Sequence, residues 1–155
     1  MNPKKMTAKR KSKKTSKSRF GKSKILAILV IVVIVAFAGW TFPVTTTQNF
    51  NLSSAGISSQ TYTIPVKTLH TTLIFKVSYS GTAGAILIAL INPNGVYVYN
   101  YSRILFDGSY STSYVLYNAT SGDWQVKVSV GLGSVNGTIT VTSMGLPWNY
   151  VFGTS

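Results

Sequence analysis

Two hydrophobic patterns divide the chain, one unbroken and one alternating. Residues 25–44, ILAILVIVVIVAFAGWTFPV, form a run of twenty residues without a charge. As an α-helix such a run extends over roughly 30 Å, about the thickness of the hydrocarbon core of a bilayer. We therefore predict a transmembrane helix over 25–44, which Pro43 ends. Trp40 and Phe42 stand near its far end, where membrane-interface aromatic residues are expected.

In the second half of the chain, apolar and polar residues alternate with a period of two. The alternation is clear over 73–80, 124–130 and 138–142, and it is typical of strands with one buried face. Residues 85–91 are apolar throughout, so we expect that strand to be buried on both faces.

Turn residues separate the predicted strands. Asn92-Pro93-Asn94-Gly95 predicts a hairpin, because proline presets one turn position and glycine readily adopts positive φ. Further strands at 61–67, 96–101 and 110–117 bring the expected number to seven or eight. The sequence thus predicts an all-β domain over 58–155, an antiparallel β-sandwich of jelly-roll-like form, with 45–57 as a spacer or a first strand.

Charge is concentrated at the N-terminus. The net charge is +13, and eleven of the fifteen Lys and Arg residues precede Ile25. Residues 1–24 contain too few apolar side chains for a core, so we expect a disordered tail. Because the positive flank of a membrane helix stays inside the cell, the tail is predicted to be cytoplasmic and the β-domain extracellular. The residues expected to contact anionic lipid headgroups are Lys9, Arg10, Lys11, Lys13, Lys14, Lys17, Arg19, Lys22 and Lys24.

A cleavable signal peptide is the main alternative to a permanent anchor. Ala36-Phe37-Ala38 has the small-x-small form that signal peptidase accepts. The length of the apolar run and of the basic region favours the anchor. Both alternatives deliver the β-domain to the outside.

Four Asn-X-Ser/Thr sequons follow the apolar run, at Asn51, Asn100, Asn118 and Asn136. A segment so rich in Ser and Thr would contain roughly two by chance, so four is a mild excess. Three of them fall at or beside predicted turns, where a glycosyltransferase could reach them. We take all four as candidate glycosylation sites.

Few residues could perform catalysis. The chain has no cysteine, which excludes disulfides and thiolate metal sites, and His70 is its only histidine, for which we expect a structural or solvated role. Asp107 and Asp123 each adjoin a glycine, which is typical of turns rather than of an acid/base pair. Residues 131–137 are glycine-rich but precede a strand, so they predict a hairpin turn and not a phosphate loop. We predict no enzyme, no cofactor and no metal.

Tyrosine is abundant between residues 97 and 117. Tyrosines are common both in β-domain cores and in recognition surfaces, and the sequence leaves both roles open. The residues concerned are Tyr97, Tyr99, Tyr101, Tyr110, Tyr114 and Tyr117.

Three segments together resemble a known kind of domain. They are 86–95 (ILIALINPNG), 121–128 (SGDWQVKV) and 137–142 (GTITVT), and over roughly 71–143 they resemble the jelly-roll sandwiches of the pre-peptidase C-terminal type and the convertase P domains. The resemblance implies a non-catalytic accessory or adhesion module that binds carbohydrate, protein or calcium. Calcium-binding members use several carboxylates, and this chain has two, so we carry over no metal site. The layout is also similar to small archaeal surface glycoproteins.

Three hypotheses for function follow. The first is a membrane-anchored surface glycoprotein, whose partners are lipid headgroups at the tail and an envelope protein or glycan at the sandwich. The second is a filament or pilus-type subunit, in which the signal is cleaved near Ala38 and residues 44–53 donate a strand to another copy. In the third the tail tethers nucleic acid or a ribosome to the membrane, although the adjoining apolar run favours lipid over nucleic acid as its partner.

Overall fold

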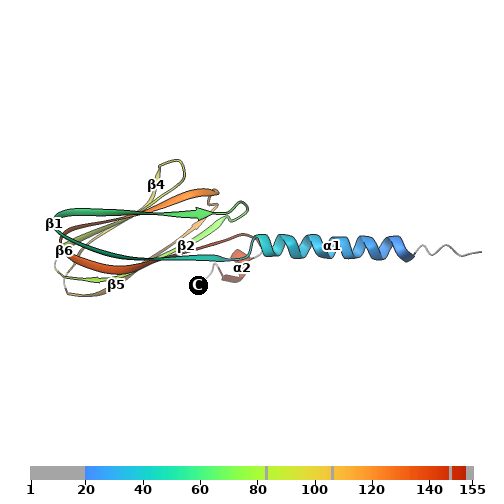
Figure 1. Ribbon diagram of the computed structural model, residues 1–155, viewed down its shortest axis with the longest axis horizontal. Coiled ribbons are helices and arrows are strands. Elements are labelled where there is room, and N and C mark those ends of the chain that lie inside the picture. The colour runs from blue at the N-terminus through green and yellow to red at the C-terminus, as the bar shows by residue number, and fades with distance from the viewer. Residues whose placement is uncertain (1–19, 83, 106, 147, 153–155) are drawn as a thin grey trace, which may run out of the picture. The chain divides into compact units, whose positions relative to one another are not determined.

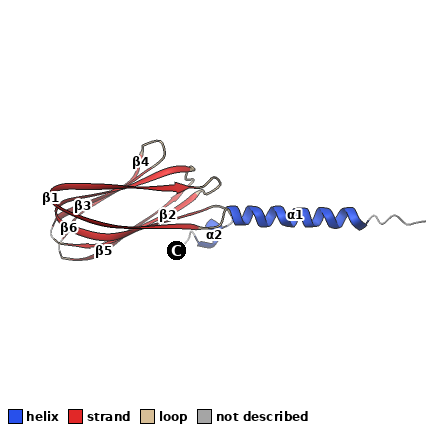
Figure 2. Cartoon of the chain, viewed as in Figure 1, coloured by secondary structure: helices blue, strands red, loops and turns tan. Residues whose placement is uncertain are grey.

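The computed structural model describes residues 20–82, 84–105, 107–146 and 148–152. It divides the chain into two compact units, residues 1–35 and 36–155. The elements are α1 (Phe20–Trp40), β1 (Val44–Val66), β2 (Thr72–Gly81), β3 (Gly84–Ile91), β4 (Tyr97–Leu105), β5 (Gly108–Tyr117), β6 (Gly122–Met144) and α2 (Trp148–Phe152). Figure 2 shows that every regular element between α1 and α2 is a strand. The all-β fold class predicted for the domain is confirmed.

Helix α1 begins earlier and ends earlier than the predicted span of 25–44. Its segment Ser23–Trp40 is long and apolar enough to cross a membrane or to act as a signal sequence. The backbone N–H of Thr41 makes the last helical bond, to the carbonyl of Phe37 at 3.1 Å, and the Thr41 hydroxyl binds the same carbonyl at 3.1 Å. Pro43 also disfavours helical geometry at the residue before it. Of the predicted lipid-contact residues, Lys22 and Lys24 lie in α1, and those from Lys9 to Arg19 lie outside the described residues.

All six strands form one antiparallel sheet that curls over on itself. β1 pairs with β6 along its whole length, while β6 pairs with β3 through its first half and with β2 through its second half. β4 extends the sheet beyond β3, and β5 extends it beyond β2. Figure 1 shows the two long strands doubling back, so that the blue-green and green halves of β1 lie in different layers.

The sandwich therefore has two layers that share two strands. The first layer contains β5, β2, the second half of β6 and the first half of β1. The second layer contains β4, β3, the first half of β6 and the second half of β1. We call the end where the long strands turn, at 54–57 and 131–133, the bend end. The opposite end, with the loops at 67–71, 92–96 and 118–121 and the C-terminal end of α1, is the helix end.

Four details of the prediction need correction. The structure has six strands instead of seven or eight, because β1 and β6 continue through the bend. Of the two alternatives for 45–57, the first strand is observed, since this segment belongs to β1, and the sandwich starts at Val44 instead of residue 58. Residues 131–133 redirect β6 from one layer to the other, with positive φ at Leu132 and Gly133, and do not form a hairpin. β3 is buried on both faces only in its second half, 88–91, as expected, whereas Ala85 and Leu87 in its first half are exposed.

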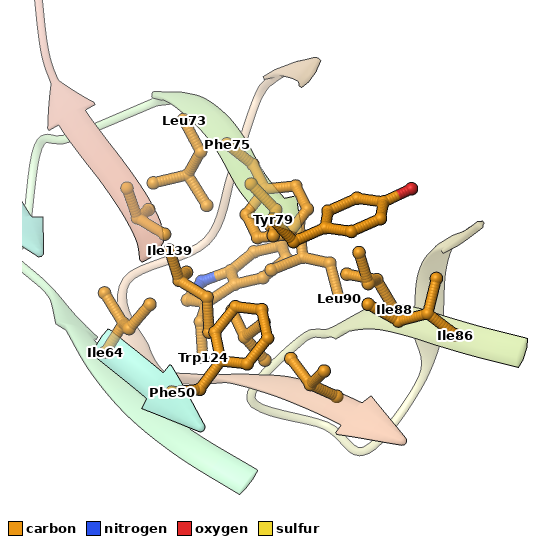
Figure 3. Close-up of a cluster of buried hydrophobic side chains, with 14 of the residues drawn as sticks. Phe50, Ile64, Leu73, Phe75, Tyr79, Ile86, Ile88, Leu90, Trp124 and Ile139 are labelled. Carbon is orange, nitrogen blue, oxygen red and sulfur yellow. The ribbon is translucent and has the colours of Figure 1, made fainter. Parts of the chain in front are cut away.

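The core lies between the two layers and draws on both halves of the long strands. Figure 3 shows Trp124, Phe75 and Phe50 in one cluster with Ile86 and Ile88 of β3. Alternate residues of β6 from Trp124 to Val130 are at most 2% exposed. Their burial follows from the period-two pattern, since one face of each strand turns inward. Gly137 is required here, because an added Cβ would come within 2.7 Å of the Phe50 ring.

Candidate functional site: the helix-end junction and the hydroxyl face

The last turn of α1 belongs to the same compact unit as the β-sandwich. A helix leaves its final carbonyl groups without partners inside the helix, so other groups must satisfy them. The indole Nε1 of Trp148 donates to the carbonyl of Ala38 at 2.9 Å, and the N–H of Gly145 donates to the carbonyl of Thr41 at 3.0 Å. The indole of Trp40 in turn donates to the carbonyl of Thr68 at 3.1 Å. We call these contacts the helix-end junction.

His70 occupies the centre of this junction and is 1% exposed. Its Nε2 lies 3.1 Å from the carbonyl oxygen of Trp40, and its Nδ1 lies 2.8 Å from the hydroxyl of Ser143. Because a carbonyl only accepts, Nε2 carries the proton and donates to it, which in the neutral ring leaves Nδ1 to accept from Ser143. The lone histidine thus has the structural role expected for it, and it ties the end of α1 to β6.

Sequence reasoning did not identify most of this junction. It singled out Trp40 and His70 separately, with no reason to bring them together. Trp148, Ser143 and Gly145 were missed. The aromatic segment after Met144 was the available signal, since an exposed loop rarely needs several large aromatic residues.

Much of the outer face of the first layer is made of hydroxyl and amide groups, with Ile74 and Val115 in a row near the helix end. Register places Thr45, Thr47, Asn49, Asn51 and Ser53 of β1 directly opposite Thr142, Thr140, Thr138, Asn136 and Ser134 of β6. Ser78, Ser80, Ser109, Ser111 and Ser113 continue the same rows onto β2 and β5, and Lys76 is the one charged residue among them. We call this surface the hydroxyl face.

Hydrogen bonds across the strands hold the hydroxyl face in a fixed arrangement. Thr45 and Thr142 bond through their hydroxyls at 2.9 Å, and the Thr138 hydroxyl donates to Asn49 Oδ1 at 3.0 Å. The Ser80 hydroxyl donates to Asn136 Oδ1 at 2.7 Å. An array of paired donors and acceptors with one cation suits a polyhydroxylated or polar partner, because it offers many hydrogen bonds.

The four sequon asparagines are all exposed, but three of them lie within strands and not at turns. Only Asn118 stands in a turn, after β5, with φ of 58°. Asn51 and Asn136 are directly opposite each other on neighbouring strands. Directly opposed residues have Cβ atoms about 5 Å apart, so a glycan on one of them would obstruct a glycan on the other.

The tyrosines divide between core and surface. Tyr99 stacks on Tyr114 with ring centroids 4.7 Å apart, and this contact joins β4 to β5 and so one layer to the other. Tyr101 and Tyr110 are also half-buried against the core, whereas Tyr97 and Tyr117 are more than half exposed.

A pair of tyrosine hydroxyls lies near the bend end. Tyr79 donates to the Tyr101 hydroxyl at 3.2 Å, and the Arg103 guanidinium lies 4.0 Å above the Tyr110 ring. Burial, and then the hydrogen bond to Tyr101, raise the pKa of Tyr79. The hydrogen bond from Tyr79, together with the nearby Arg103, lowers the pKa of Tyr101.

The remaining candidates do not come together. Asp123 begins β6 at the helix end, while Asp107 precedes β5 at the bend end, so the two carboxylates are on opposite ends of the sandwich. Within the described ranges, no three His, Cys, Asp or Glu side chains form a metal-binding group. The second layer carries a shallow groove lined by Ile57, Leu87 and Ile104, with Arg103 and Lys127 beside them.

Comparisons with known proteins identify no family. No family model matches the chain, and no curated protein matches its sequence. Solved structures with a similar fold include the enzymatically active domain of tailspike protein 4 of bacteriophage CBA120, at TM-score 0.46 and 14% identity over 63% of this chain. A second is a chain of infectious bursal disease virus, Gx strain, at TM-score 0.43 and 15% identity over 69% of this chain. A third is a chain of the disulfide-linked pili of Bacillus endospore appendages, at TM-score 0.41 and 11% identity over 66% of this chain.

These similarities are too distant to bear on function. The matched part of this chain spans 17% of the tailspike chain, 33% of the viral chain and 88% of the pilus chain. None of the three is a pre-peptidase C-terminal domain or a convertase P domain, so that resemblance stays a prediction.

Proposed function

We propose that the chain is a membrane-anchored, non-catalytic surface module, in which α1 holds the β-sandwich at the outer side of the membrane. The observation that carries this proposal is the helix-end junction. His70, Gly145 and Trp148 bind carbonyls in and just after the last turn of α1, so this turn is part of the folded domain. Cleavage after Ala38 would remove the carbonyl that Trp148 binds but would leave the carbonyls of Trp40 and Thr41, so the Trp148 contact is the one that favours a retained helix.

The hydroxyl face is the surface that we assign to partner binding. Its partner would be an envelope glycan or a polar protein surface, recognised by many hydrogen bonds instead of by charge. A glycan attached to Asn51 or Asn136 would cover part of this face, since both residues belong to it. Site-resolved glycan analysis therefore decides whether the face binds a partner or carries a sugar.

The membrane part of the proposal is tested by intact mass and protease accessibility in native cells. We expect a mass that includes residues 1–38, carbonate-resistant membrane association and digestion of the β-domain from outside the cell. A mature N-terminus at Gly39 would overturn the anchor. A full-length chain in the soluble fraction would overturn both the anchor and the outward topology.

A second candidate function, assembly into filaments, is favoured by the open edge of β1. β1 has 23 residues without one charged side chain, and among the described residues only β6 pairs with it. Exposed, uncharged edges of this length invite pairing with another chain. Residues 44–53 are already paired with β6 and bury Phe50 and Leu52, so strand donation would require an exchange of this segment between copies.

Adding charge to the β1 edge distinguishes the two candidate functions, the surface module and the filament subunit. Thr47→Lys with Thr61→Lys places cations on both halves of the strand at exposed positions. If the protein assembles through this edge, light scattering of the variant will show smaller particles than the wild type. The matched variant Ser111→Lys with Ser113→Lys, on β5, should leave the particle size unchanged. Identical monomers throughout would rule out the filament hypothesis.

A further inference from the structure

Exposed apolar side chains gather at the helix end of the sandwich. Among the described residues outside α1, twelve large apolar side chains are exposed, and eight of them lie at this end. These eight are Phe42, Leu69, Val96, Tyr97, Tyr117, Leu146, Tyr150 and Val151. The bend end has three, Ile57, Ile104 and Leu132. Burial within the domain does not explain such a one-sided distribution.

Six apolar residues lie on segments that adjoin the last turn of α1, and we call them the collar: Phe42, Leu69, Leu146, Trp148, Tyr150 and Val151. Phe42 and Trp148 are in edge-to-face contact with centroids 5.1 Å apart, and Trp148 binds the carbonyl of Ala38. The loop of Leu69 touches Gly145, since a Cβ on Gly145 would collide with the Leu69 carbonyl. Tyr150 is 77% exposed and Val151 61%. The collar thus adjoins the point where the apolar helix ends.

Leu69 gives independent support. Its φ is 71°, a left-handed conformation that costs a bulky residue energy and that glycine or asparagine adopts more easily. Its side chain is nevertheless 49% exposed, so packing offsets little of this cost. Strained residues of this kind cluster at functional sites, where the side chain is needed for an interaction.

From these observations we propose that the collar is a second membrane contact, inserted into the lipid headgroup region of the bilayer that α1 crosses. The inference rests on the proposed membrane anchor. The partner is a lipid surface because the collar is continuous with the end of an apolar helix, at the level where Trp40 would stand at the interface. The apolar face of an interfacial amphipathic helix buries about 5–10 Å into this boundary, and we expect the collar to reach a comparable depth. The sandwich then lies against the membrane at the collar and directs the bend end outward.

The chain has no cysteine, so a single introduced cysteine gives a unique label in the full-length protein. We would reconstitute the chain in vesicles of phosphatidylcholine and phosphatidylglycerol and attach an environment-sensitive fluorophore to Tyr150→Cys, to Ala55→Cys at the bend end, or to Val30→Cys in α1. Phospholipids with a nitroxide near the headgroup should quench the label at position 150 at least about threefold more than the label at 55, consistent with interfacial depth. Iodide in the water should show the opposite order.

Leu69→Asn in the labelled Tyr150→Cys chain provides a separate measurement. Asparagine suits the positive φ, so the fold should keep its stability while the collar loses its leucine and the lipid quenching at position 150 decreases. If position 30 is quenched by lipid while position 150 behaves like position 55, the collar proposal is wrong and the anchor stands. If position 30 is itself accessible to iodide, the anchor fails, and the collar proposal fails with it.

Discussion

The two ends of the sandwich are built from the same long strands, β1 and β6, but in different ways. At the bend end, β1 and β6 pass from one layer to the other through Gly56, Leu132 and Gly133, two of which have positive φ. At the helix end, a buried histidine, two indoles and a glycine hold the last turn of α1, and apolar side chains surround it. The bend end therefore needs backbone freedom, whereas the helix end needs particular side chains. Substitutions should therefore matter far more at the helix end.

The largest effect is expected for Trp124→Ala. Trp124 is 2% exposed, and its indole donates to the Thr120 carbonyl at 2.8 Å near the helix end. Removal of a large buried aromatic side chain typically lowers the free energy of unfolding by about 3–5 kcal/mol. The control Ile57→Ala, at an 86% exposed position of the bend end, should change it by less than about 0.5 kcal/mol. Urea unfolding followed by circular dichroism measures the free energy of unfolding of both variants. Equal decreases in the two would contradict the proposed difference between the ends.

His70→Ala should have the next largest effect. The change leaves the Trp40 carbonyl and the Ser143 hydroxyl without their partner, and an orphaned buried polar group costs about 1–3 kcal/mol. Ser134→Ala at the bend end, where the hydroxyl is exposed, should be nearly neutral. His70→Gln can still donate to the carbonyl and should recover part of the loss. A fully stable His70→Ala protein would show that the junction is incidental to the fold.

Alkaline pH should act on the other end, through Tyr79. The pKa of Tyr79 is raised in the folded state, so its contribution to stability is complete below pH 10 and is lost as the pH rises further. The lowered pKa of Tyr101 has the opposite sign, since it adds stability once that hydroxyl ionises. In Tyr79→Phe the hydroxyl pair is gone, and we expect a weaker dependence of the melting temperature on pH between 9 and 11. An unchanged profile would exclude the pair as its origin.

The smallest effect concerns Tyr62, midway between the ends. Its hydroxyl is buried and has no hydrogen-bond partner among the described residues, and burial raises its pKa. Tyr62→Phe removes a desolvated group, so the free energy of unfolding should stay the same or rise by up to about 1 kcal/mol. A loss of more than that, measured by thermal unfolding, would mean that the hydroxyl has a partner such as a bound water.

Much of the fold could be predicted from the sequence because its signals are local. The alternation in 73–80 and 124–130 predicts which side chains of β2 and β6 turn inward, and the Asn92–Gly95 hairpin forms as expected, with Asn92 Oδ1 accepting from the N–H of Val96 at 2.9 Å. The continuity of β1 and β6 could not be predicted in the same way. Glycine and serine near 54–57 and 131–133 are as typical of a hairpin as of a bend between layers.

The site was less predictable because its members are far apart in the chain. Trp40, His70 and Trp148 meet only after β6 has paired with both β1 and β2. The hydroxyl face likewise depends on register, since Thr45 and Thr142 become neighbours across 97 residues. Each residue alone is an ordinary polar or aromatic position, and the pattern exists only in the folded sheet.

The sharing of β1 and β6 has a mechanical consequence. Each layer contains half of both strands, so neither layer can separate without pulling a covalently continuous partner out of the other. Partial opening would uncover the same core from both sides. The domain should therefore unfold cooperatively in one step, and a load applied through α1 would meet the resistance of the whole sandwich at once.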